Sequence, residues 1–303
     1  MKNNPTKKHH YLPRYYLRGF TDNEGGFFVY DKRADKIFPT SPDAFFFEND
    51  LNTVTLPNGN TSDFLEEMYT DIENDSWKYL DSVRESTPDL PIQLMDKMHL
   101  FLFLLFLHWR LPSNIGFVEE LSATFFHGNN VTDYFKLVSK TSDTVPKEII
   151  EEISGSPAFK KTAKMIVPFA PFFKDTHWSH GLVNWQFCHT GDGKNWYIVG
   201  DNPIVTHGHN DHDPVNCLKE FIFPVSGKVL LLSVNRPMSG TLPPDFVIQY
   251  SIAIIERARR FVACPNKDFL EAMVKHYKLY VQYDKTGIII DELFNMVEEK
   301  EGT

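Results

Sequence analysis

The run of apolar residues from Met98 to Trp109 constrains the fold of this chain more than any other feature of its sequence. It is about twelve residues long, too short to cross a bilayer core of roughly 30 Å. Charged residues bound it, with Asp96 before it and Arg110 after it. A helix that is apolar on every side must be buried in protein. The run therefore predicts a fully buried helix over 91–110, inside a large soluble protein.

The cysteines and the amino terminus indicate the compartment. Three cysteines are an odd number, and no Cys-x-x-Cys pair occurs, which argues against a disulfide framework, a disulfide-linked partner and a thiolate zinc site. The first residues contain no apolar stretch of the kind found in secretory signals. We therefore expect a cytoplasmic protein.

The net charge limits the partners. A formal charge of −9 opposes general attraction to nucleic acid or to an anionic membrane. Residues 1–20 nevertheless carry five lysines and arginines and no acid. This local excess leaves room for an anion site, so that nucleic acid or a phosphorylated small molecule is an expected partner and a membrane is not.

Hydrophobic periodicity and turn residues predict the order of the elements. The first 60 residues suggest a short helix between Pro13 and Gly19, a hairpin over 27–38 and a loop over 41–60. Helices are predicted from Ser62 through Leu80 and over 91–110, 115–127, 131–140, 146–154, 157–166, 246–261, 267–281 and 290–300. Two hairpins are predicted in the second half, the first from 182–189 and 196–201 and the second from 217–226 and 228–234.

This separation of helices from strands favours the α+β class over a doubly wound sheet. We expect a large helical region packed with a mostly antiparallel sheet that is built from hairpins in the second half. The chain is interpreted as a single domain, 1–303, since no repeat or low-complexity linker divides it. Its expected parts are a basic arm and hairpin (1–60), a helical region (61–175) and a sheet with C-terminal helices (176–303).

The first candidate site is the polar cluster HHYLPRYYLRGF, residues 9–20. His10 is the candidate general base or metal ligand, because an imidazole titrates near neutral pH. Arg14 and Arg18 are four residues apart and would share a helix face, where they can clamp a phosphate or carboxylate. The alternative is a basic arm docked onto the acidic segment 66–75. The candidate substrate-binding residues of this cluster are His9, Arg14, Tyr16 and Arg18.

The second candidate joins Arg110 to the turn at Asp201 and Asn202. A buried arginine at the end of an apolar helix needs a carboxylate partner, for which Asp201 is one candidate. Arg110 also suits a helix C-terminus, which favours a cation. Asp201 follows a predicted strand, so it is a candidate catalytic carboxylate together with Asn202. An ordinary Asx-turn before a proline is the alternative.

A third candidate is the string THGHNDH, which matches the His-x-His-x-Asp-His spacing of metallo-β-lactamase-type hydrolases. Such a cluster can hold zinc and lower the pKa of a bound water to about 7. Here it stands between two predicted hairpins, where a polar surface loop is the ordinary explanation. The candidate ligands of this divalent metal ion are His207, His209, Asp211 and His212.

Four segments carry a family resemblance. The opening run contains His10, Tyr11, Leu12, Pro13, Tyr16, Leu17 and Phe20; the others are Arg110 with Pro112, the turn 200–203, and ERARRFV at 256–262. In these the chain resembles a bacterial family known only as domain of unknown function 4238, with Arg14 and Gly200 departing from its usual glutamine and serine. The resemblance implies a shared fold and a candidate site, and it brings no activity.

Three hypotheses follow. The first is a nuclease-like hydrolase of a phosphodiester, in which His10, Asp201 and Asn202 act on a substrate bound by the arginines. The second is a binding or regulatory module, in which the same residues form a buried polar network. The third is a zinc hydrolase at 207–212. The chain has no Gly-rich phosphate loop and no Gly-x-Ser-x-Gly elbow, which disfavours nucleotide triphosphate hydrolysis, dinucleotide redox chemistry and esterase chemistry.

Overall fold

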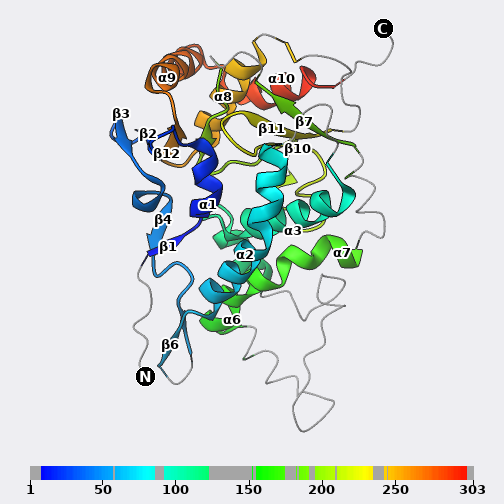
Figure 1. The fold of residues 1–303 in the computed structure, drawn as a ribbon. Helices are drawn as coiled ribbons and strands as arrows, with labels where there is room; N and C mark the ends of the chain where they lie inside the picture. Colours follow the sequence, from blue (N-terminus) through cyan, green and yellow to red (C-terminus); the bar gives the residue numbers. More distant parts are fainter. Residues whose placement is uncertain are drawn as a thin grey trace.

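The computed structural model describes residues 8–56, 59–85, 92–122, 152, 155–174, 182, 184–190, 195–208, 210–234, 242–243 and 245–298. Within them the strands form two four-stranded sheets and two two-stranded ribbons, and every pairing is antiparallel. Helices surround these sheets (Figure 1), which confirms the α+β class. The predicted helices over 131–140 and 146–154 lie outside the described residues, apart from Glu152.

The first sheet joins segments that lie far apart in the sequence. Its strands are β2 (Phe27–Asp31), β3 (Lys36–Thr40), β8 (Val199–Gly200) and β12 (Phe261–Cys264), in the order β3-β2-β12-β8. The predicted hairpin over 27–38 is present as β2 and β3. The predicted helix over 246–261 ends at Arg257, and its last residue starts β12 instead. β12 is therefore a central strand that the helical pattern before it concealed.

Gly200 lets β8 lie close to the helix that packs on this sheet, α8 (Phe246–Arg257). A Cβ atom at residue 200 would lie 3.1 Å from Ile254 Cγ2 and 3.3 Å from Ala258 Cβ. Such contacts are tighter than ordinary packing. A side chain at this position would require its neighbours to shift by a few tenths of an ångström.

The second sheet contains β7 (Trp185–His189), β9 (Val205–Thr206), β10 (Phe221–Pro224) and β11 (Val229–Ser233), in the order β7-β11-β10-β9. The predicted hairpin of β10 and β11 is confirmed. The predicted hairpin of 182–189 with 196–201 is wrong, because β7 pairs with β11 and β8 pairs with β12. Every residue of β11 is buried, and a buried central strand needs a partner on each side.

Two short ribbons include strands from the segment 41–60, where a loop was predicted. β1 (Lys8–His10) pairs with β4 (Phe47–Asn49), and β5 (Val54–Thr55) pairs with β6 (Thr61–Ser62). The β1–β4 ribbon places His9 opposite Glu48 and His10 opposite Phe47. Backbone pairing thus fixes the start of the N-terminal polar cluster.

The predicted buried helix is α3 (Leu94–Arg110), which packs against α2 (Phe64–Arg84). All its residues from Leu100 onward are buried except Leu102. It ends before Pro112, since a residue that precedes proline avoids the helical region and Leu111 is extended. The other α-helices in the described residues are α1 (Arg14–Leu17), α4 (Ile115–Ser122), α6 (Pro157–Thr162), α7 (Ala170–Lys174), α9 (Lys267–Gln282) and α10 (Ile289–Asn295).

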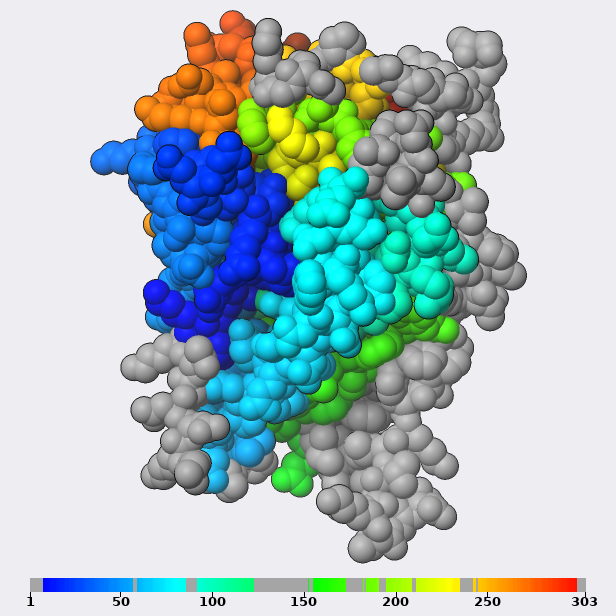
Figure 2. All heavy atoms as spheres, viewed as in Figure 1, coloured from blue at the N-terminus to red at the C-terminus, as the bar shows by residue number. Residues whose placement is uncertain are grey.

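The N-terminal segment, residues 8–20, lies between the strands that follow it and α2 (Figure 2). The figure shows it in dark blue, with α2 in cyan and α9 in orange above. Tyr16 stacks on Phe223 of the second sheet at 5.3 Å and donates a hydrogen bond to the Pro224 carbonyl. Both rings belong to one apolar core that includes α3 and strands of both sheets.

No single helix of the described chain is long and apolar enough to cross a bilayer. The bent pair of α3 and α4, at 89° to one another, meets that requirement only when both are counted together, by length and composition.

Candidate functional site

Arg110 is the centre of a buried ionic contact between α3, α2 and β1. Its guanidinium is paired with Glu73 at 2.6 Å, donates a second hydrogen bond to the His10 carbonyl and lies over the Tyr69 ring. Only 3% of Arg110 is exposed. The carboxylate partner of Arg110 is therefore Glu73, and the pairing predicted with Asp201 is wrong. The contact links the N-terminal segment to the helical half, as the second hypothesis expects.

A neighbouring network fixes His9. Its Nδ1 accepts a hydrogen bond from the backbone N–H of Asn52 at 2.8 Å, and the Asn52 side chain donates to Glu66 at 2.8 Å. The Asn52 oxygen lies 3.4 Å from the ammonium of Lys164, which is fully buried. Burial lowers the pKa of Lys164 to about 8. These contacts give the fully buried His9 a structural position inside the protein.

His10, the candidate general base, is also buried. Its ring packs against Phe47 with 5.4 Å between centroids, and 7% of the residue is exposed. Burial, helped by the positive charges of Arg14 and Arg110, lowers its pKa to about 4. Its Nε2 is buried and has no hydrogen-bond partner among the described residues. At neutral pH the ring is uncharged, and it is a weaker base than an exposed imidazole.

Asp201 binds the backbone that connects α8 to β12. Its carboxylate accepts hydrogen bonds from three successive backbone N–H groups, of Arg259 at 2.7 Å, Arg260 at 2.8 Å and Phe261 at 2.9 Å. Burial raises the pKa of Asp201, whereas these three donors act to lower it. The neighbouring Asn202 oxygen is buried and without a partner among the described residues. Asp201 is thus used as a backbone acceptor, which resembles the Asx-turn alternative but spans 58 residues.

Asp201 nevertheless borders a small surface pocket of about 150 Å³. Three of the four segments that carried the family resemblance meet in it: the opening run, the turn at 200–203 and the segment ERARRFV. The pocket is lined by Tyr11, Arg33, Phe47, Glu48, Asp201, Arg259, Arg260 and Phe261. We call this set the arginine pocket.

The charges of the arginine pocket are partly paired. Arg259 contacts Glu48 at 3.3 Å, and this pair is exposed. Arg260 binds Asp31 with two of its nitrogens, at 2.8 Å for the shorter contact. Arg33 is exposed, and no ion pair of its guanidinium is found in the described part of the chain. One cation of the pocket is therefore available and a second is only weakly held.

The remaining predicted substrate-binding residues lie elsewhere. Arg14 is paired with Asp43 at 3.0 Å in an exposed contact, and Arg18 is exposed. Tyr16 is fully buried in the core. None of the three lines the arginine pocket. Of the opening run, Tyr11 lines the pocket.

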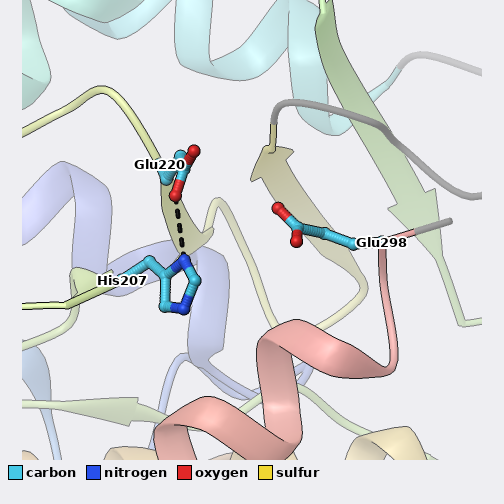
Figure 3. Close-up of side chains that lie close together, drawn as sticks. All are labelled: His207, Glu220 and Glu298. Carbon is cyan, nitrogen blue, oxygen red and sulfur yellow. Dashed lines mark hydrogen bonds and ion pairs between the residues drawn. The ribbon is translucent and has the colours of Figure 1, made fainter. Parts of the chain in front are cut away.

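The predicted metal ligands do not assemble as a set in the described residues. Asp211 is held by Arg257 at 2.8 Å and by the Thr206 hydroxyl at 2.6 Å, and the His212 ring stacks on Phe117. His209 lies outside the described residues. His207 instead lies beside two other carboxylates, Glu220 and Glu298 (Figure 3).

Sequence reasoning did not single out Arg33, Glu48, Arg259 or Arg260 as site residues. The one signal for them was the family segment at 256–262, which carries two of these arginines. Arg33 and Glu48 stand in a turn and a short strand whose neighbours in space come from distant segments. No local pattern identifies such neighbours.

Two buried imidazoles give a pH prediction. The pKa values of His10 and His108 are lowered to about 4, mainly by burial, against about 6.5 in the unfolded chain. Between about pH 6.5 and pH 4 these imidazoles bind protons in the unfolded chain but remain neutral in the folded chain. The free energy of unfolding should therefore fall as the pH is lowered across this window. The expected loss between pH 7 and pH 5 is roughly 2 kcal/mol per imidazole.

Urea unfolding at pH 7 and pH 5 measures this loss. His108→Gln should flatten the dependence, because the amide can still donate to the Asp211 carbonyl that His108 Nε2 contacts at 2.8 Å and carries no titrating group. The exposed His276→Gln is the control. An equal slope in wild type and His108→Gln would contradict the assignment.

The comparisons with known proteins add one finding. A family model described as "Protein of unknown function (DUF4238)" matches residues 8–268 of the chain. No curated protein and no solved structure matches it.

Proposed function

Because this chain belongs to the DUF4238 family, whose description states no activity, we propose its function from the site itself: it is a binding module for a phosphorylated small molecule. The ligand's phosphate would occupy the arginine pocket. The observation that carries the proposal is the convergence of Arg33, Arg259 and Arg260 on one small pocket. Guanidinium groups match the geometry of phosphate oxygens and bind them through paired hydrogen bonds.

The charges of the pocket favour an anion despite its two carboxylates. Asp201 has its oxygens occupied by three N–H donors, which disperse its charge. The exposed Arg259–Glu48 pair contributes less than about 1 kcal/mol, so a phosphate can displace Glu48 at small cost. Arg33 needs no displacement. A phosphate would thus gain two guanidinium partners.

The size and walls of the pocket favour a small molecule. A volume of about 150 Å³ is below the roughly 300–1,000 Å³ of pockets that enclose a whole ligand, so it suits one charged group. Tyr11, Phe47 and Phe261 supply apolar walls beside it. Burial raises the pKa of the Tyr11 phenol, so this hydroxyl stays protonated and can donate. The net charge of −9 opposes a long polyanion, which is why nucleic acid is the weaker partner.

The buried polar network supports binding over turnover. His10 and Arg110 are largely sealed from solvent, and Asp201 is committed to the backbone. Hydrolysis of a phosphodiester by His10, Asp201 and Asn202 would need these groups to reach a substrate. We therefore rank the hydrolase second, and zinc hydrolysis at 207–212 after it. We propose a cytoplasmic location, because Cys188, Cys217 and Cys264 are all free thiols.

Calorimetric titration with sugar phosphates and nucleoside monophosphates, in buffer without phosphate or sulfate, tests the proposal. Arg33→Ala should weaken binding of the best ligand at least tenfold, since a hydrogen bond to a charged group contributes about 1.5–3 kcal/mol. Arg259→Ala should act in the same direction. Raising the salt concentration should weaken binding further.

Arg14→Ala is the control, because Arg14 is exposed like Arg33 and ion-paired like Arg259 but does not line the pocket. Its affinity should equal that of wild type. Equal affinities of wild type and Arg33→Ala would refute the pocket. Turnover of a phosphodiester that is lost in His10→Ala, with the melting temperature unchanged, would establish the hydrolase instead.

A further inference from the structure

Away from the arginine pocket, three side chains from three elements converge on one point. His207 follows β9, Glu220 precedes β10, and Glu298 follows α10. One nitrogen or oxygen atom from each lies within 4.8 Å of the other two. Figure 3 shows the two carboxylates turned toward the same side of the imidazole. The figure also shows the hydrogen bond from His207 Nδ1 to Glu220 Oε2, at 2.9 Å.

The fold holds this group in place. The His207 N–H donates to the Glu220 carbonyl at 3.0 Å, which extends the pairing of β9 with β10 to these two residues. The His207 ring stacks on Phe294 of α10 with 4.5 Å between centroids and 12° between planes. Glu298 stands four residues after Phe294, and its N–H bonds back to the Phe294 carbonyl. The same helix end thus orients the imidazole and presents the second carboxylate.

The charges of the group are unbalanced. No lysine or arginine forms an ion pair with Glu220 or Glu298 in the part of the chain that the structure describes. Two carboxylates that approach one another repel, and a divalent cation between them removes this repulsion. All three residues are only partly buried, so an ion can enter from solvent.

We propose that His207, Glu220 and Glu298 form a binding site for a divalent ion of the zinc class. One imidazole nitrogen with two carboxylate oxygens suits Zn²⁺ and its first-row neighbours, whereas Mg²⁺ and Ca²⁺ prefer oxygen alone. In a tetrahedral zinc site the ligand atoms lie about 3.4 Å apart, as bonds of about 2.1 Å require. The distance from His207 Nδ1 to Glu220 Oε2 is close to this spacing. Rotation of the Glu298 side chain would bring its carboxylate to the same distance from both ligand atoms. Water completes the coordination.

The site is distinct from the predicted set at 207–212, with which it shares only His207. It connects the end of α10 to the edge strand β9 of the second sheet. A bound ion would therefore anchor the C-terminal helix to the sheet, and binding should raise the stability of the whole chain.

Titration of the metal-free full chain with zinc chloride tests the proposal. One ion should bind per chain and raise the melting temperature. Glu298→Gln preserves the size of the side chain and removes its charge, so it should weaken zinc binding at least tenfold and abolish the thermal shift. Cobalt as a probe adds a second measurement, because its visible absorption reports coordination by protein ligands. The absorption band should change in Glu298→Gln and in Glu220→Gln.

Two further variants separate this site from other zinc binding. Asp291→Asn lies on α10 at an exposed position and should bind zinc like wild type. His212→Ala removes a member of the predicted set and should also leave binding unchanged. The proposal is overturned if Glu298→Gln binds zinc with wild-type affinity, if His212→Ala alone abolishes binding, or if magnesium at equal concentration displaces the zinc.

Discussion

Replacing Arg110 with methionine should lower the free energy of unfolding by about 3–5 kcal/mol, the usual cost of removing one partner from a buried ion pair. The change leaves the Glu73 carboxylate without its cation and the His10 carbonyl without its donor. Methionine fills much of the space, so most of the loss comes from unpaired polar groups and not from a cavity. Urea unfolding measures it.

Two companion variants sharpen this test. Arg14→Met breaks an exposed ion pair and should cost less than about 1 kcal/mol. Adding Glu73→Leu to Arg110→Met removes the orphaned carboxylate and should restore part of the lost stability, since replacing a whole buried pair by apolar residues is often tolerated. A single variant as stable as wild type would show that Arg110 does not anchor the N-terminal segment.

Asp201→Ala should cost at least about 3 kcal/mol, because three backbone N–H groups lose a buried, charged acceptor and each hydrogen bond to a charged group contributes about 1.5–3 kcal/mol. The free energy of unfolding of Asp201→Asn should lie between those of Asp201→Ala and wild type. The amide keeps one acceptor oxygen, but its NH₂ group faces the remaining backbone N–H donors. Thermal and urea unfolding both measure the order of the three proteins.

The control is Asp22→Ala. Asp22 also accepts from backbone N–H groups, those of Glu24 and Gly26, but it is exposed, so water replaces the lost acceptor and the cost should stay below about 1 kcal/mol. A purely catalytic Asp201 makes the opposite prediction, in which Asp201→Asn keeps the melting temperature and loses turnover.

Local patterns predicted the elements whose causes are local. The buried helix α3 follows from a continuous apolar run, and the β2–β3 and β10–β11 hairpins follow from turn residues between apolar segments. The partners of β7 and β8 were missed, because each pairs with a strand that is distant in sequence. β12 was missed for a related reason. The predicted helix over 246–261 included Phe261, the first residue of β12. Pairing with β2 and β8 and the hydrogen bond from the Phe261 N–H to Asp201 keep β12 extended.

The site followed the same rule. Sequence patterns singled out the opening run, Arg110 and the turn at Asp201 as candidates. Their partners were not found, because Glu73 and the backbone of 259–261 are joined to them only by the tertiary fold. His207 was singled out as a metal ligand, but neither Glu220 nor Glu298 belongs to the string that identified it. A short sequence motif can indicate one candidate ligand. It cannot indicate residues that come close only in the folded chain.

The position of β12 between β2 and β8 has a consequence for synthesis of the protein. During translation β2 leaves the ribosome long before β12 is synthesised. Until then, the edge of β2 that pairs with β12 has unpaired backbone N–H and C=O groups. Nascent chains that stop short of Phe261 expose this edge and are therefore candidates for aggregation or chaperone capture. Completion of this sheet therefore comes late in synthesis, when β12 pairs with β2 and β8.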